Sequence, residues 1–93
     1  MEQKMSAGQP AQHRYSKKQW RALGASLNLT PRELEIVRTL LDVETAPAAA
    51  RRLDISQNTV RTHLKRIYSK LSVTNRVGLV LLVVDELAAQ PGD

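Results

Sequence analysis

The sequence contains no cysteine, only four scattered glycines, and no long hydrophobic run. Without cysteine it can form neither a disulfide framework nor a cysteine-based zinc module, which fits a reducing cytoplasm. The scattered glycines form no glycine-rich phosphate loop. The most apolar run, VGLVLLVV at residues 77–84, is too short to cross a bilayer, and the first residues, MEQKMSAGQPAQ, lack the apolar core of a signal peptide. We therefore predict a cytoplasmic protein that does not span a membrane.

Acidic residues are in the minority. Lys and Arg together number 14, against 9 Asp and Glu, and the isoelectric point is about 10.1. Such an excess favours a polyanionic partner, either nucleic acid or an anionic membrane surface, although a small protein can be basic for no specific reason. A membrane surface is the weaker choice, because the basic and the most apolar stretches fall in different predicted helices. The length of 93 residues predicts one domain with a marginal core, which association with a partner subunit would stabilise.

Capping residues and apolar spacing predict an all-α chain of five short helices. Disordered polar tails are expected at residues 1–15 and 89–93, on either side of a domain at 16–88. The first helix surrounds Trp20, and the others are expected at about 31–42, before Leu53, at 57–71, and up to about Leu87. Residues 77–84 are rich enough in Val for a strand, but the length of the run and the cap before it favour helix. The expected capping residues are Ser16 with Gln19, Thr30 with Glu33, Thr45, Ser56, and Thr74 or Asn75.

The middle of the chain has the order of a helix-turn-helix motif. A short helix ends at Leu53, a tight turn follows, and Ser56 caps the next helix. Asp54 is expected to adopt a positive φ in the turn, which Asp tolerates better than a branched residue does. In such a motif the second helix reads DNA and the first braces it, so residues 57–71 become the candidate recognition helix.

Placed on a helical wheel at about 100° per residue, residues 57–71 divide into three stripes. The apolar stripe occupies a narrow arc and is expected to face the core. It consists of Val60, Leu64, Ile67 and Leu71. The stripe directly opposite contains Asn58, Arg61, Thr62, Lys65 and Ser69. The flank between them contains Thr59, His63, Arg66 and Lys70. A helix with this pattern suits a DNA major groove, where the outermost stripe meets base edges and the flank meets the sugar–phosphate wall.

The recognition segment also lacks negative charge. Residues 55–76 contain no Asp or Glu, although ordinary solvated amphipathic helices interleave acids with bases. The alternative explanation is an ordinary solvated amphipathic helix, but contact with solvent does not require that all of its charged residues be basic. We therefore expect base contacts from Asn58, Arg61, Thr62 and Lys65, and phosphate contacts from His63, Arg66 and Lys70.

Four segments, LTPRELEIVRTLL, AARRLDIS, NTVRTHLKRIYSKLSV and TNR, resemble the LuxR-type (GerE-type) helix-turn-helix DNA-binding domain. The resemblance covers about residues 29–87 and implies a four-helix domain whose third helix lies in the major groove. It implies base contacts at Arg61, Thr62 and Lys65, and backbone contacts at Thr59, His63, Lys70 and Arg76. Members of this family usually dimerise through the last helix.

The sequence departs from the family pattern in three places. Val43 and Asp54 stand where the family often has glycine, and Pro47 and Ala48 stand where an acidic residue is usual. These changes fall in the scaffold and its turns and leave the recognition helix intact. The N-terminal helix around Trp20 lies outside the family unit.

The last predicted helix is apolar nearly all the way round, which a small domain can bury on one side only. Leu79, Val80 and Val83 are expected to face inward. The outward residues, spaced i, i+4, i+7, are Val77, Leu81 and Val84, and we expect them to form the interface of a symmetric dimer. The alternative is that the N-terminal helix covers this face, with Trp20 as the lid.

These patterns predict a sequence-specific double-stranded DNA-binding transcriptional regulator. An enzyme is not expected, because the sequence offers no convergent catalytic site. His63 has no partner at ligand spacing, so neither a metal nor any other cofactor is expected. Glu33 and Glu35 do not face each other on a helix, which argues against paired-carboxylate catalysis. The alternative function is a protein–protein interaction module, in which a degenerate helix-turn-helix binds another regulatory protein through the last helix.

Overall fold

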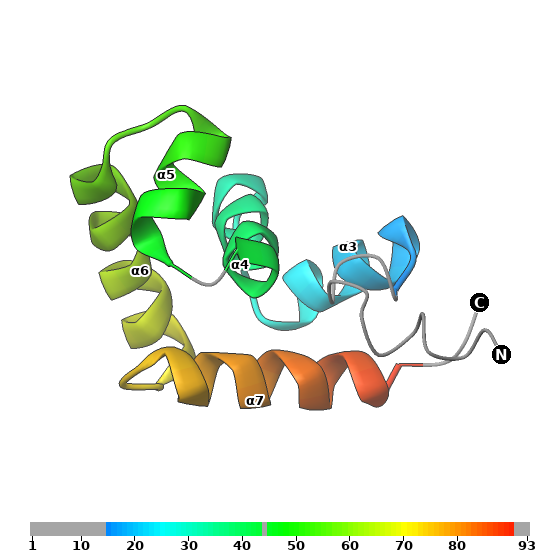
Figure 1. The fold of residues 1–93 in the computed structure, drawn as a ribbon. Helices are drawn as coiled ribbons and strands as arrows, with labels where there is room; N and C mark the ends of the chain where they lie inside the picture. The colour runs from blue at the N-terminus through cyan, green and yellow to red at the C-terminus, as the bar shows by residue number, and fades with distance from the viewer. Residues whose placement is uncertain (1–14, 44, 91–93) are drawn as a thin grey trace, which may run out of the picture.

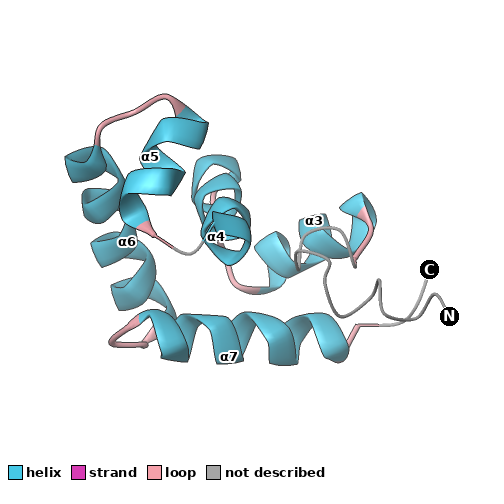
Figure 2. Cartoon of the chain, viewed as in Figure 1, coloured by secondary structure: helices cyan, strands magenta, loops and turns pink. Residues whose placement is uncertain are grey.

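The computed structural model describes residues 15–43 and 45–90, which form five α-helices joined by short loops and contain no strand (Figures 1 and 2). The predicted all-α class is therefore confirmed. The predicted tails at 1–15 and 89–93 lie mostly outside the described residues. Of the parts that are described, Tyr15 places its ring edge-on to Trp20, and Ala89 caps the last helix. No helix in the described ranges is long and apolar enough to cross a bilayer.

The first two helices begin at the predicted capping boxes. Helix α3 spans Lys17–Ser26, and Ser16 and Gln19 form reciprocal side-chain-to-backbone bonds at its start. Helix α4 spans Pro31–Val43, and the Thr30 and Glu33 pair repeats the arrangement. Each box satisfies backbone N–H groups that the first helical turn leaves without partners.

The helix-turn-helix consists of α5, Ala46–Leu53, and α6, Gln57–Leu71. The Thr45 side chain accepts from the backbone N–H of Ala48, and Asp54 ends α5 with φ 58°, as expected for this turn. Ser56 caps α6. The last helix, α7, spans Arg76–Ala88, and Asn75 rather than Thr74 is its cap.

The core lies where α4 is surrounded by the other helices. Helix α4 contacts α3, α5 and α6, and α3 also packs along α7, which runs beneath both in the view of Figure 1. Apolar spacing predicts a single buried stripe on α4, formed by Leu34, Val37, Leu40 and Leu41. That stripe is too narrow, because Ile36 lies outside it and is fully buried. A helix with neighbours on several sides buries a wider arc than the single stripe that periodicity predicts.

Helix α3 approaches α4 closely at Gly24. A Cβ atom built on Gly24 would lie 3.1 Å from the nearest methyl carbon of Leu34, so any larger residue would require Leu34 to shift. Trp20 and Leu23, which precede Gly24 on the same helix, are buried in the common core. The N-terminal helix is therefore an integral part of the domain.

Candidate nucleic-acid interface

Helix α6 lies at one edge of the molecule, with α4 and α5 on a single side of it (Figure 1). The packed side is the predicted apolar stripe. Val60 and Ile67 are fully buried, and Leu64 and Leu71 are partly buried against the core. Burial of this stripe fixes which face of α6 is turned away from the domain.

The predicted base-reading stripe lies on the outward face of α6. The four residues of this stripe that are predicted to contact bases are all exposed, and they are Asn58, Arg61, Thr62 and Lys65. Thr62 donates its hydroxyl hydrogen to the backbone oxygen of Asn58 at 2.9 Å, and Arg61 makes a long contact of 3.4 Å with Gln57. Lys65 makes no hydrogen bond or ion pair with any described residue. The long cationic side chains can thus reach a ligand without breaking strong contacts.

The flank residues differ among themselves in how accessible they are. Arg66 is exposed and has no polar partner among residues 15–43 and 45–90, whereas Thr59 and His63 are half-buried. The Thr59 hydroxyl lies 2.9 Å from that of the capping residue Ser56. An open hollow between α4 and α6 is lined by Glu33, Lys65, Arg66, Ser69 and Lys70.

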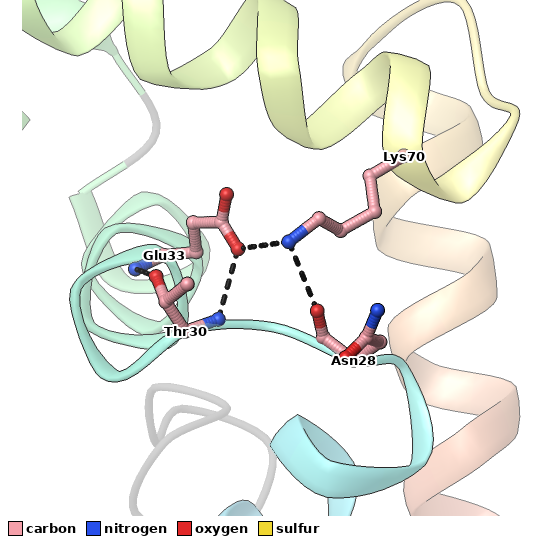
Figure 3. Close-up of polar contacts among 4 residues, drawn as sticks. All are labelled: Asn28, Thr30, Glu33 and Lys70. Atoms are coloured by element: carbon pink, nitrogen blue, oxygen red, sulfur yellow. Dashed lines mark hydrogen bonds and ion pairs between the residues drawn. The ribbon is translucent and has the colours of Figure 1, made fainter.

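Lys70 and Arg76, both predicted to contact phosphate, are already bonded within the protein. The Lys70 ammonium contacts Glu33 Oε1 at 2.7 Å and the backbone oxygen of Asn28 at 3.0 Å (Figure 3). The Arg76 guanidinium donates to the backbone oxygen of Leu40. Local spacing in the sequence could not reveal these partners, because they lie more than 30 residues away from Lys70 and Arg76.

Glu33 was recognised in the sequence as a capping residue only, yet it is one of two buried polar or charged residues in the described part of the chain. Burial raises the pKa of its carboxyl group, but the hydrogen bonds from Lys70 and Thr30 and the positive charge of Lys70 outweigh that effect. The pKa of Glu33 therefore lies below its usual value, and the carboxylate is charged at neutral pH. Its negative charge is matched by Lys70 and adds little to the net field around α6.

Two further acids near the motif are paired away from α6, whereas Asp54 is exposed in the turn that precedes α6. Asp42 on α4 bonds Arg52 on α5, and Glu35 bonds Arg32 within α4. Helix α6 itself contains no acid, so its outward face carries positive charge that none of its own residues offsets. Among the described residues, no three His, Asp or Glu side chains form a group that could hold a metal ion.

Helix α7 exposes an apolar strip formed by Val77, Leu81 and Val84, which are 66, 60 and 41% exposed. Leu79 and Val83 are buried on the opposite side, as predicted, and Val80 is half-buried. The alternative, that the N-terminal helix covers this face with Trp20 as the lid, is wrong. Helix α3 packs on α7 and buries Trp20, but it leaves the three strip residues exposed.

Comparison with known proteins points to one family. The model for "Bacterial regulatory proteins, luxR family" matches residues 27–83. The chain is 46% identical over 52 residues to the monoamine regulon transcriptional regulator of Klebsiella aerogenes, a match that covers 56% of this chain and 23% of that protein. It is 36% identical over 58 residues to the nitrate/nitrite response regulator protein NarL of Escherichia coli, covering 62% and 27% of the two chains.

The match therefore spans about a quarter of the length of these curated relatives. No solved structure matches the chain. Helix α3, up to Ser26, precedes the matched residues, whereas all of α5 and α6 lie within them.

Proposed function

This chain belongs to the luxR family of bacterial regulatory proteins, and we propose that it reads specific double-stranded DNA with α6 in the major groove. The supporting observation is the outward face of α6, where Arg61 and Lys65 are exposed on a segment without acids. The major groove is about 12 Å wide and admits an α-helix with its side chains. A role on chromosomal DNA implies the cytoplasmic location that the composition also favours.

Each exposed side chain of the outer stripe has a partner in the groove. Arg61 and Lys65 can donate to guanine O6 and N7, and Asn58 can pair with the adenine edge. The methyl group of Thr62 can contact a thymine methyl. Arg66, His63 and Thr59 lie on the flank and would contact phosphates, which position the helix without reading sequence. Arg76, at the start of α7, would reach the backbone only by giving up or sharing its bond to Leu40.

Replacing Arg61 and Lys65 together with alanine tests the base-reading proposal. A pool of random duplexes is first selected with the purified wild-type chain at physiological salt, which identifies the preferred sequence. We expect the Arg61→Ala/Lys65→Ala variant to lose roughly tenfold or more in affinity for that sequence, because a good base contact contributes about 1–3 kcal/mol of discrimination. The measurement is fluorescence anisotropy with the selected duplex and a scrambled one.

The matched control is Lys18→Ala/Arg21→Ala, which removes the same charge from exposed positions of α3. It is expected to keep the sequence preference of the wild type. If the α6 variant kept the same ratio of selected to scrambled affinity, its residues would not read bases. A wild-type chain that selected no duplex but retained a regulatory protein partner would favour the interaction-module alternative.

We further propose that two copies associate through the exposed apolar strip of α7. The strip residues Val77, Leu81 and Val84 recur at i, i+4, i+7, so a second copy related by a two-fold axis can bury the same residues in both subunits. Such a dimer would place two α6 helices on a two-part DNA site. The proposal rests on the exposure of residues that a monomer would otherwise leave in water.

The substitution Leu81→Glu is expected to separate this dimer. It places a charge at the centre of the strip, where burial of an unpaired carboxylate is costly, while the buried side of α7 is untouched. Sedimentation equilibrium should give the mass of two chains for the wild type and of one chain for Leu81→Glu. Ala22→Glu, on the exposed side of α3, should remain a dimer. An unchanged mass for folded Leu81→Glu would contradict the proposed interface.

A further inference from the structure

One cationic side chain of α6 is directed toward α4, although it remains partly exposed. Lys70 extends from the last turn of α6 to the first turn of α4, where its ammonium bonds both Glu33 and the backbone of Asn28 (Figure 3). Asn28 has a positive φ of 58°, which turns the chain between α3 and α4 and brings its backbone oxygen within 3.0 Å of the ammonium. Two of the three donors of this lysine are therefore used in bonds within the chain.

The carboxylate that receives Lys70 is itself held in place. One oxygen atom of Glu33 accepts both the ammonium, at 2.7 Å, and the backbone N–H of Thr30, at 2.9 Å. The backbone N–H of Glu33 donates to the Thr30 hydroxyl at 3.1 Å. Because the capping box orders the Glu33 side chain, its carboxylate is a fixed attachment point rather than a mobile surface acid.

This pair joins the end of the recognition helix to the scaffold helix. Apolar contacts of residues such as Val60 and Ile67 also hold α6 against the domain. They resist separation of the helices, but they define the rotation and sliding of α6 less sharply than directional bonds do. Base contacts require donor–acceptor distances near 3 Å, so a small rotation of α6 would misplace Arg61 and Lys65 together.

We propose that Lys70 is a positioning residue for DNA reading: its bonds to Glu33 and Asn28 set the placement of α6, and it does not neutralise a phosphate. This inference rests on the proposed function, and it replaces the phosphate contact that the helical wheel and the family resemblance both predict for Lys70. The Glu33 side chain is 9% exposed and that of Lys70 31%, and such a partly buried pair can contribute more to specificity than to stability.

The two roles of Lys70 predict opposite effects for Glu33→Gln. If Lys70 binds phosphate, loss of the Glu33 charge would free its ammonium for DNA. DNA affinity would then stay the same or rise. A positioning Lys70 would lose its attachment point, so affinity for the selected duplex should fall about tenfold, a typical coupling for residues in direct contact. Glutamine retains the capping box with Thr30, so α4 keeps its start and the variant is expected to fold.

Lys70→Met and the double variant Glu33→Gln/Lys70→Met complete the test. If the pair acts as one unit, the double variant should bind no more weakly than either single variant. The double variant also keeps the net charge of the wild type. Its plot of log affinity against log salt should therefore have the wild-type slope, whereas loss of a phosphate contact would reduce the slope by about 0.9 for each protomer. Lys70→Arg should restore most of the affinity, since arginine can make the same pair.

Anisotropy titrations at several salt concentrations measure the affinities and the salt slopes. Circular dichroism first establishes that each variant is folded under these conditions. Unchanged or tighter binding by Glu33→Gln, or a reduced slope for the double variant, would overturn the positioning role. A wild-type chain that selects no duplex would instead refute the proposed function. These two failures are distinguishable because the first requires specific binding by the wild type.

Discussion

Replacing Trp20 with alanine is expected to lower the free energy of unfolding by about 3–5 kcal/mol. Trp20 is only 1% exposed, and its ring meets the edge of Tyr15 at 6.4 Å between centroids. The Arg38 guanidinium lies 5.2 Å from the same ring, a cation–π arrangement. Truncation would leave a cavity between α3 and its neighbours and would remove both ring contacts at once.

The loss is large relative to the stability of the whole domain. Domains of this size are stable by about 5–15 kcal/mol, so the Trp20→Ala variant would approach the unfolding threshold at physiological temperature. Urea titration followed by circular dichroism would measure the change, and the melting temperature should fall by roughly 12 °C or more. Leu27→Ala, at the half-buried end of α3, is a control expected to cost less.

The result bears on where the domain begins. The family match starts at residue 27, after Trp20, so a unit that folded without α3 would lose less than about 1 kcal/mol from this substitution. A loss in the expected range would instead establish α3 as part of the cooperative unit. The packing of α3 on both α4 and α7 favours the second outcome.

DNA affinity is expected to fall by roughly 10³ to 10⁵ between 50 and 200 mM salt, if a dimer neutralises about 6 to 10 phosphates. Each neutralised phosphate releases condensed counterions, and added salt opposes that release. The acid-free α6 supplies the exposed cations Arg61, Lys65 and Arg66, and two copies would double the number. The measurement is a series of anisotropy titrations with the selected duplex.

The variant Arg66→Ala is the positive control for the salt-slope experiment. Arg66 is exposed on the flank and has no polar partner in the described part of the chain, so Arg66→Ala should reduce the salt slope by about 0.9 per protomer. The Lys18→Ala/Arg21→Ala variant of α3 should leave the slope unchanged. A flat salt response of the wild type would count against DNA as the partner.

Interactions between close neighbours in the sequence were predicted correctly. The capping boxes at Ser16 and Thr30 each join residues three apart, and the positive φ of Asp54 follows from the sharp turn before Ser56. The outward stripe of α6 follows from the 3.6-residue period, because the buried position of Val60 and Ile67 fixes the opposite face. The outward direction of Leu81 was predicted in the same way.

The sequence by itself therefore determined the helices, their caps and the face of α6 that meets solvent, since these depend on residues within about one helical turn. Only the tertiary structure decided that Lys70 bonds Glu33, 37 residues away, and that α3 packs on α7 without covering Leu81. Such pairings depend on how whole helices are placed against one another. That placement is set by the combined packing of the core, and no local pattern encodes it.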